Sequence, residues 1–354
     1  MDPDTPAGHE LAAAYSRELV EPLIARELPG LRYATARLGS GSDVLGLDDA
    51  TSRDHDWGCR LTLLVDRADA AVVPVLHDLL ARLLPERFRG LPVRFATTWN
   101  PVVSHRVEVA TVGGFAASRL GVDPLPGLST VDWLTLTGQS VLETTAGPVF
   151  TDATTELAEL RRILAWYPCD VERYVLACGW QRLTQRTPMV GRTADTGQPL
   201  RSRLLAAALV DDLVSLAFLV HRRWAPYDKW RDALFARLPG AGALAAPLGR
   251  AVAAEDWPDR EAALVAAVEV LLDIQRRRGL PTPETGVVPF WDRPYRTVSG
   301  QVPGVLLDEI TDPFLSALPV RAGAVGQWID SADVLTAADR RVAIMAVYEL
   351  WASR

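Results

Sequence analysis

Two aspartates and a glycine–serine turn are the residues of this sequence best suited to chemistry. The turn is Gly39-Ser40-Gly41-Ser42, and the aspartates are the outer residues of Asp54-His55-Asp56. Small residues let backbone amides approach an anion closely, and a serine hydroxyl can bind a phosphate oxygen. Paired carboxylates beside phosphates hold Mg²⁺, and two such ions about 4 Å apart can stabilise both oxygens of a displacement. The sequence therefore predicts phosphates on the turn and metal on Asp54 and Asp56.

A third carboxylate, Glu108, interrupts the apolar run Arg106–Ala110. If the strand that this run predicts lies beside the strand of the aspartates, Glu108 faces the same site. There it would be a third metal ligand or the general base for an attacking hydroxyl. A glycine–serine turn or an Asp-x-Asp pair alone is more often a loop or a solvated surface. The order of helix, strand, turn, Asp-x-Asp and strand with glutamate makes the combination informative.

The elements around these residues follow from apolar periodicity. In the first part of the chain we predict helices over His9–Glu27 and Ala70–Leu84 and strands over Tyr33–Leu38, Asp54–Val65, Val93–Ala96 and Arg106–Val112. In the long strand, alternation places both aspartates one pleat apart on a polar face, with Arg60 further along it. The opposite face, from His55 to Val65, is apolar and favours packing. We expect Gly113-Gly114 to end the last strand and residues 141–149 to form a hairpin.

The pattern of apolar residues changes near residue 150, from short runs separated by turns to long stretches with helical periodicity. We predict helices over Glu156–Ala165, Asp170–Arg186, Ser202–Arg223, Lys229–Leu238, Ala243–Ala254, Asp259–Gly279 and Ala337–Ala352, with a hairpin over Val287–Val298. A length of 354 residues suits two domains. The fold class is therefore α+β, with a mixed sheet flanked by helices over residues 1–150 and a helical domain over residues 151–354.

Composition and charge exclude several classes of function. The formal net charge of −7 argues against general nucleic-acid binding, which needs a basic surface. The most apolar helical stretch, Leu204–Val220, contains Asp211 and Asp212, which argues against a membrane span. The first ten residues are polar and acidic, so we expect no secretory signal and a cytoplasmic protein. Three cysteines without a C-x-x-C pair indicate neither a disulfide framework nor a zinc site.

Lys229 is the only lysine of the chain, and it stands in the aromatic segment Trp224–Trp230. One interpretation is a helix corner packed by tryptophans, with Lys229 at the surface. The other is that Tyr227 and Lys229 reach nucleotide phosphates from the helical domain. Arg53, beside the aspartates, would bridge a carboxylate or contact a phosphate.

The order of these motifs resembles the nucleotidyltransferase superfamily that includes DNA polymerase β, poly(A) polymerases and the aminoglycoside nucleotidyltransferases. Its signature is an apolar-Gly-Ser turn, an Asp-x-Asp or Asp-x-Glu pair and a later carboxylate. Leu38-Gly39-Ser40, Asp54-x-Asp56 and Glu108 match these parts. The spacing departs from the signature, since 14 positions separate Ser40 from Asp54 and 12 separate Ser42 from it. The phosphate-binding serine therefore stays open between Ser40 and Ser42.

More narrowly, the chain resembles the bacterial family of unknown function called DUF4037 over nearly its whole length. The block Ser-Arg-Asp-His-Asp-Trp-Gly at residues 52–58 is the most specific part of this resemblance. The other similar segments are Gly41–Gly46, Leu164–Pro168, Arg223–Trp230 and Asp292–Arg296.

The resemblance implies a nucleotidyltransferase-like sheet domain and an active site in the cleft that the helical domain closes. It implies Mg²⁺-dependent transfer of a nucleoside monophosphate from a nucleoside triphosphate to a hydroxyl or amine of a small polar acceptor, with pyrophosphate released. Asp54, Asp56 and Glu108 would hold one or two Mg²⁺ ions. The residues that would contact the nucleotide are Gly39, Ser40, Gly41, Ser42, Arg53, Tyr227 and Lys229.

The expected partners are a nucleoside triphosphate and a small acceptor, and an acidic cleft would suit a cationic acceptor such as an aminoglycoside. We expect neither nucleic acid nor a membrane, and a protein partner stays open. One alternative function is a non-catalytic nucleotide- or protein-binding regulatory module of the same fold, antitoxin-like. Another is a metal-dependent phosphohydrolase, in which water replaces the acceptor. The products separate these hypotheses: a nucleotidylated acceptor, no product, or a free nucleoside monophosphate.

Overall fold

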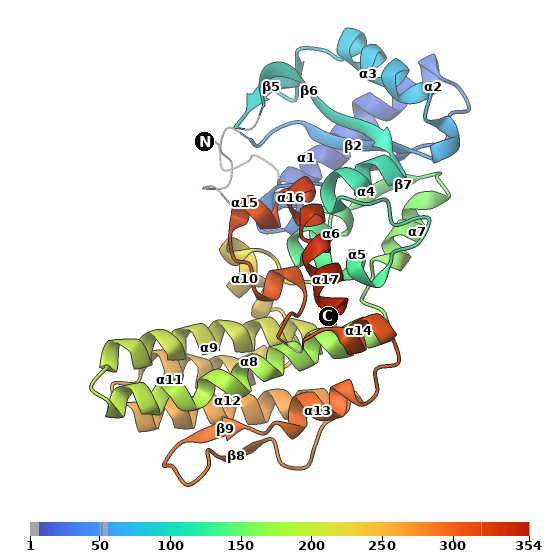
Figure 1. Cartoon of the computed structure of the whole chain (residues 1–354). Helices are drawn as coiled ribbons and strands as arrows, with labels where there is room; N and C mark the ends of the chain where they lie inside the picture. Colours follow the sequence, from blue (N-terminus) through green and yellow to red (C-terminus); the bar gives the residue numbers. More distant parts are fainter. Residues whose placement is uncertain (1–6, 50, 52–55, 99, 320, 354) are drawn as a thin grey trace. The chain divides into compact units, whose positions relative to one another are not determined.

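The computed structural model describes residues 7–49, 51, 56–98, 100–319 and 321–353. The chain divides into two compact units, which Figure 1 shows in the colours of the sequence. The first, called here the sheet unit, comprises Met1–Leu128, Gln139–Ala165 and Thr336–Asp339. The second, called the helical unit, comprises Ser129–Gly138, Trp166–Leu335 and Arg340–Arg354. The predicted α+β fold class is confirmed, with a mixed sheet in the first unit and mainly helices in the second.

The sheet unit contains a five-stranded sheet in the order β5-β6-β2-β1-β7. Its strands are β1 (Ala34–Ala36), β2 (Arg60–Val65), β5 (Arg94–Thr97), β6 (Asn100–Thr111) and β7 (Val149–Asp152). The central pair β2 and β6 is parallel and places Thr62 opposite Glu108, whereas the other pairs are antiparallel. A separate pair of short strands, β3 (Arg87–Phe88) and β4 (Leu91–Pro92), forms a small hairpin. The strand of Glu108 is thus the direct neighbour of β2.

The helical segments of the sheet unit are α1 (Gly8–Tyr15), a π-helical turn (Ser16–Val20), α2 (Glu21–Glu27), α3 (Val72–Leu83), α4 (Val112–Leu120), α6 (Gly138–Thr145, which begins at the unit boundary) and α7 (Glu156–Ile163). The apolar face of β2 packs against α1, the π-helical turn, α2 and α3. Leu61, Leu63 and Val65 pack into one core with Tyr15 of α1 and Leu76 of α3. The predicted apolar face of this strand is therefore confirmed, and its burial removes hydrocarbon from water.

The long strand predicted from Asp54 is wrong over residues 56–59, because β2 begins only at Arg60. Gly58 bends the chain there with a φ of +153°, a backbone conformation that favours glycine. A Cβ atom at Gly58 would lie 3.1 Å from the ring of Phe95. Asp56 therefore lies in a turn and not on a strand face, so the one-pleat spacing does not describe its position. Asp54 lies outside the described residues.

The hairpin predicted over residues 141–149 is also wrong, because the chain forms α6 and then β7. Val141 and Thr144 are buried three positions apart, as on one helix face. The hydroxyl of Thr144 donates to the carbonyl of Ser140, four residues earlier, at 2.8 Å. Packing of this face against the sheet unit overrides the strand preference of β-branched residues.

Gly113-Gly114 was expected to end a strand, and β6 does end just before it, at Thr111. The chain then continues directly as α4. The Thr111 hydroxyl accepts a hydrogen bond from the amide of Gly114 at 3.1 Å and so caps this helix. This immediate turn from strand to helix brings α4 back over β2 and β6.

The helical unit is built around four long helices that run side by side in Figure 1. They are α8 (Cys169–Asp195), α9 (Pro199–Val220), α11 (Ala241–Ala253) and α12 (Trp257–Arg277). The shorter helices are α5 (Thr130–Thr135), α10 (Asp228–Phe235), α13 (Gln301–Leu307), α14 (Pro313–Ala317), α15 (Ala332–Leu335), α16 (Ala338–Ala343, which begins in the sheet unit) and α17 (Met345–Ala352). Strands β8 (Val287–Pro289) and β9 (Arg296–Val298) form the predicted hairpin. Among the described helices, none has the length and apolar character that spanning a bilayer requires.

Candidate functional site

The Gly39–Ser42 turn is held by a buried arginine. Arg37 is 2% exposed, and its Nε and Nη2 atoms donate to the two carboxylate oxygens of Asp43 at 2.7 and 2.9 Å. The same guanidinium donates to the carbonyls of Leu38, at 2.6 Å, and Ser40, at 2.8 Å. One rigid planar group thus binds both sides of the turn and fixes its shape.

Glycine is required at two positions of the turn. Gly39 and Gly41 have φ values of +88° and +136°. A Cβ atom at Gly41 would lie 2.3 Å from an oxygen of Asp43 and 2.6 Å from a nitrogen of Arg37. The amide of Gly39 donates to the carbonyl of Glu143 in α6 at 2.7 Å. Side chains are therefore excluded, and the backbone of the turn lies directly against its charged neighbours.

Glu108 lies beside this turn and forms an ion pair. Nη2 of Arg119, on α4, donates to both carboxylate oxygens of Glu108 at 2.8 and 2.7 Å. The guanidinium carbon of Arg119 lies 4.9 Å from the centre of the Phe115 ring, which supports this orientation. A Cβ atom at Gly39 would be 3.4 Å from Arg119 Nη2 and 3.9 Å from Glu108 Oε2. The structure thus brings together the predicted turn and the predicted third carboxylate.

Asp56 joins the loop before β2 to the turn between β5 and β6. Its carboxylate accepts hydrogen bonds from the amide of Thr98, at 2.7 Å, and from the Thr98 hydroxyl, at 2.5 Å. A carboxylate has about four acceptor positions, so these bonds leave capacity for further ligands. Arg53 and Asp54, the other predicted site residues of this loop, lie outside the described residues.

Arg60 stands between the turn and the Asp56 loop. Its Nη2 atom is 3.4 Å from the hydroxyl of Ser40, and its Nη1 atom is 3.5 Å from the backbone carbonyl of Asp56. Both distances are long for a hydrogen bond between nitrogen and oxygen. The first residue of β2 therefore reaches toward two of the predicted site segments.

The charge of Arg60 reflects the groups that surround it. Burial, and then the nearby charge of Arg37, lower the pKa of Arg60 to about 9. The carboxylates that raise this pKa are those of Asp43, Glu108 and Asp56. Arg60 stays positively charged at neutral pH, and three acidic groups interact with this single guanidinium.

A pocket of about 420 Å³ opens among these residues. Its charged lining residues, besides two histidines, are Arg37, Arg60, Arg106, Arg119 and Glu108. Ser40 lines it as well, whereas Ser42 does not. The net charge led us to expect an acidic cleft. The described part of this pocket is instead mainly basic, because four of these five charges are positive. Net charge is a property of the whole surface and does not set the local field.

The described residues do not by themselves complete a metal site. Within them, no group of three histidine, cysteine, aspartate or glutamate side chains could hold a metal ion. The oxygens of Asp56 and Glu108 are of the kind that Mg²⁺ prefers. In this structure they accept hydrogen bonds from Thr98 and Arg119. A set of three ligands depends on Asp54.

Tyr227 and Lys229 belong to the helical unit. Lys229 is exposed on α10, with its ammonium 4.7 Å from the centre of the Trp230 ring. Tyr227 is half-buried just before that helix. The Trp224 ring packs edge-on against Tyr167 at 4.5 Å between centres. These contacts match the packed-corner interpretation, and nucleotide contact by Tyr227 and Lys229 stays a prediction.

Four residues of the site were missed by the sequence reasoning: Arg37, Asp43, Arg60 and Arg119. A signal existed for Arg60, which lies on the polar face of the predicted strand. Arg119 left no local signal, because its contact with Glu108 depends on the chain turning straight from β6 into α4. The pairing of Arg37 with Asp43 depends on the three-dimensional course of the turn between them.

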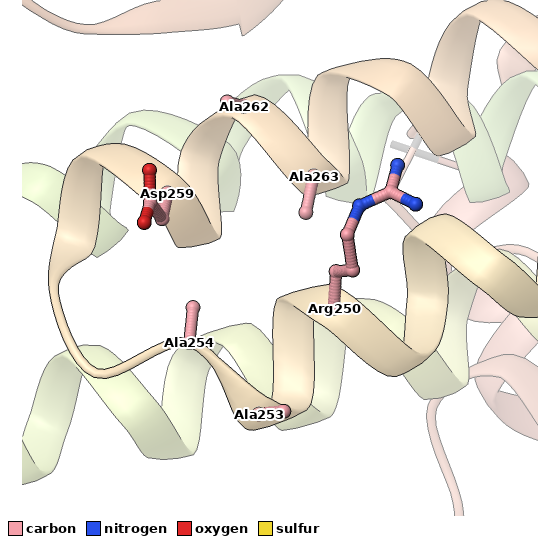
Figure 2. Close-up of a pocket in the computed structure, with 6 residues that line it drawn as sticks. All are labelled: Arg250, Ala253, Ala254, Asp259, Ala262 and Ala263. Carbon is pink, nitrogen blue, oxygen red and sulfur yellow. The ribbon is translucent and has the colours of Figure 1, made fainter.

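A second cavity, of about 460 Å³, lies between α11 and α12 in the helical unit. Figure 2 shows alanine side chains between Arg250 on α11 and Asp259 at the start of α12. Methyl groups and one charge of each sign provide few specific contacts. No residue predicted for the site lines this cavity.

Comparison with known proteins supports the narrower resemblance for part of the chain. Residues 133–231 match the family described as "Domain of unknown function (DUF4037)", which confirms the resemblance over that range. The range contains two of the similar segments, Leu164–Pro168 and Arg223–Trp230. Among solved structures, the chain is similar to a nucleotidyltransferase-like protein from Exiguobacterium sibiricum 255-15, at 12% identity with a TM-score of 0.29. That similarity covers 75% of this chain and 77% of the other. No match was found among curated proteins.

Proposed function

We propose that this chain is a nucleotidyltransferase that moves a nucleoside monophosphate from a nucleoside triphosphate to a hydroxyl or amine of a small polar acceptor. One observation carries the proposal: the Gly39–Gly41 backbone lies against Glu108 and Arg60 at the wall of a pocket of about 420 Å³. The exposed backbone of Gly41, the hydroxyl of Ser40 and the guanidinium groups are suited to phosphate oxygens. A carboxylate at the same place is suited to proton transfer or metal binding.

In this reaction the acceptor oxygen or nitrogen forms a bond to the α-phosphorus. The bond from that phosphorus to the oxygen bridging the α- and β-phosphates breaks, and pyrophosphate leaves with the electron pair. The acceptor must lose a proton. Glu108, whose side chain is 41% exposed, is the carboxylate that we propose as its base or as a metal ligand. In either role it must first separate from Arg119.

We propose Mg²⁺ as the metal of this reaction, with Asp54, Asp56 and Glu108 as its ligands. When bound, the ion would supply positive charge to the phosphate oxygens. The Gly39–Ser42 turn would hold the triphosphate. Arg53, Tyr227 and Lys229 stay proposed contacts of the nucleotide, and we expect the protein to act in the cytoplasm.

A second candidate function is a non-catalytic nucleotide-binding module. The observation that favours it is that the two described carboxylates already have partners: Glu108 pairs with Arg119, and Asp56 accepts from Thr98. A site in which these contacts persist would bind a nucleotide without transferring it. This candidate predicts binding but no product.

Calorimetric titration of Mg-ATP, Mg-GTP, Mg-CTP and Mg-UTP tests the binding step. The proteins to compare are the wild type and the double variant Asp54→Asn, Asp56→Asn. Binding that needs Mg²⁺ and is lost in the double variant would support the carboxylate site and identify the base. Absence of binding of all four nucleotides to well-folded protein would overturn both candidates.

Product analysis separates the candidates that bind nucleotide. The protein is incubated with the nucleotide that binds, labelled at the α-phosphate, and a panel of small polar acceptors that carry a hydroxyl or an amine. Label on an acceptor together with released pyrophosphate supports the transferase. Free nucleoside monophosphate indicates a phosphohydrolase, and an unchanged nucleotide indicates the non-catalytic module.

A further inference from the structure

The wall of the sheet-unit pocket concentrates positive charge in an acidic protein. The whole chain has a formal net charge of −7. Yet four arginines and one glutamate line this pocket of about 420 Å³. Clustered guanidinium groups repel one another, and an anion bound among them relieves that repulsion. The local charge therefore favours an anionic ligand.

Two of the four arginines hold the pocket together. Arg37 donates to Asp43 and to two carbonyls of the turn. Arg106 donates from Nε to the carbonyl of Phe95 at 2.7 Å and from Nη2 to the carbonyl of Val102 at 2.7 Å. Because these donors are used inside the protein, Arg37 and Arg106 shape the wall and supply background charge.

The other two arginines lie on either side of the turn. A Cβ atom at Gly39 would be 3.4 Å from Nη2 of Arg119, and one at Gly41 would be 3.5 Å from Nη1 of Arg60. The hydroxyl of Ser40, between these glycines, is 3.4 Å from Nη2 of Arg60. Each of the two guanidinium groups thus lies beside one glycine of the turn, and both arginines line the same pocket as Ser40.

We propose that Arg60 and Arg119 bind the oxygens of a polyphosphate chain that lies along the Gly39–Gly41 turn. The inference rests on the proposed function only for the source of that chain, the triphosphate of a nucleotide. A guanidinium presents paired donors that match a phosphate group and keeps its charge at neutral pH. Arg60 would bind from the β2 side of the turn and Arg119 from the α4 side.

The proposal has a consequence for Glu108. Nη2 of Arg119 now donates to both oxygens of that carboxylate. A phosphate that takes this nitrogen competes with Glu108, so anion binding would release the carboxylate. Arg119 would in this way couple the binding of phosphate to the availability of Glu108.

Binding of sodium tripolyphosphate, measured by calorimetry in the presence of EDTA, tests the proposal without metal or turnover. The proteins are the wild type, Arg60→Gln, Arg119→Gln and the control Arg26→Gln, whose side chain is 65% exposed in the same unit. We expect each pocket variant to bind at least tenfold more weakly than wild type and the control to bind equally. Unchanged affinity in both pocket variants, or no binding to the wild type, would overturn the proposal.

Two additions guard against trivial explanations. Circular dichroism checks that each variant is folded. If Arg60→Gln does not fold, the tripolyphosphate affinities of Arg119→Gln and Arg60→Lys are compared with that of the wild type in its place. Sodium sulfate at matched ionic strength checks for simple charge screening, and it should compete weakly.

The failure of this inference is distinguishable from failure of the proposed function. Mg-nucleotide binding that needs Asp54 but not Arg60 or Arg119 would leave the function and overturn the inference. Tripolyphosphate binding that needs both arginines, without any nucleotide transfer, would support the inference and overturn the transferase function.

Discussion

Arg37 and Asp43 form a bidentate ion pair beneath the Gly39–Ser42 turn, with nitrogen–oxygen distances of 2.7 and 2.9 Å. Both side chains are less than 10% exposed. The same arginine binds the carbonyls of Leu38 and Ser40. The pair is thus part of the folded core and also the scaffold of the proposed phosphate site.

Removing one member of this pair should destabilise the protein strongly. Asp43→Asn leaves a buried guanidinium without its counter-charge, and we expect the free energy of unfolding to fall by about 3 kcal/mol. Urea unfolding followed by circular dichroism measures the loss. The matched control is Glu27→Gln, which breaks the exposed pair of Arg26 and Glu27 and should cost less than about 1 kcal/mol. Equal losses in the two variants would show that the buried pair does not support the fold.

A comparison of alanine variants at Gly39 and Gly30 distinguishes the effect of backbone strain from the effect of a side chain placed in the site. Their φ values are +88° and +86°, so alanine at either position should cost about 1 kcal/mol of stability. A Cβ atom at Gly30 meets nothing within 4 Å, whereas one at Gly39 lies 3.4 Å from Arg119. We therefore expect Gly39→Ala to weaken Mg-nucleotide binding and Gly30→Ala to leave it unchanged, as measured by calorimetry. A loss of binding in both variants would mean that general destabilisation is the cause.

Local sequence patterns were enough to predict which residues of the strand that carries Arg60 pack into the core behind the site. Alternation alone placed Leu61 and Leu63 in the core, because a half-buried strand imposes a period of two on its side chains. It also placed Arg60 on the opposite face. The parallel partner of this strand was left conditional, since pairing between strands depends on contacts distant in sequence. The register that sets Glu108 opposite Thr62 had to come from the structure.

The predictions that were wrong share one physical cause. The chain bends at Gly58, where the Phe95 ring leaves no room for a side chain, and no residue near Asp56 signals that contact. Val141 and Thr144 prefer strands when considered alone, yet they lie on the buried face of a helix. In each case tertiary packing overrides local preference. Arg119 reaches Glu108 for a related reason, because α4 folds back directly after β6.

The three cysteines should differ sharply in reactivity. Burial raises the pKa of the Cys59 thiol to about 11 and that of the Cys178 thiol to about 12, whereas Cys169 is exposed. The thiolate is the reactive form, so iodoacetamide at pH 8 should label Cys169 in the native protein and spare the other two. Peptide mass spectrometry identifies the labelled sites, and labelling in denaturant should reach all three. Rapid labelling of native Cys59 would contradict the burial of this residue in the core of the sheet unit.

Stability should fall as the pH is lowered from about 6.5 to 5. Burial, and then the neighbouring His77, lower the pKa of His105. Burial, and then the positive charges of Arg278 and Arg223, lower the pKa of His221. In the unfolded chain these histidines bind a proton as the pH falls below their ordinary pKa near 6.5. In the folded protein they bind it only at a lower pH. The unfolded state gains protons first, so the free energy of unfolding declines with falling pH, by at most about 1.4 kcal/mol per pH unit for each histidine.

His221 permits a direct test of this pH dependence. Its ring is buried, and neither ring nitrogen has a hydrogen-bond partner among the described residues. His221→Phe should therefore break no hydrogen bond of the described part and should remove one titrating group from the core. We expect urea unfolding between pH 8 and 5 to show a shallower decline in the free energy of unfolding of this variant than in that of the wild type. An unchanged slope in His221→Phe would mean that this histidine accepts its proton as easily in the folded protein as in the unfolded chain.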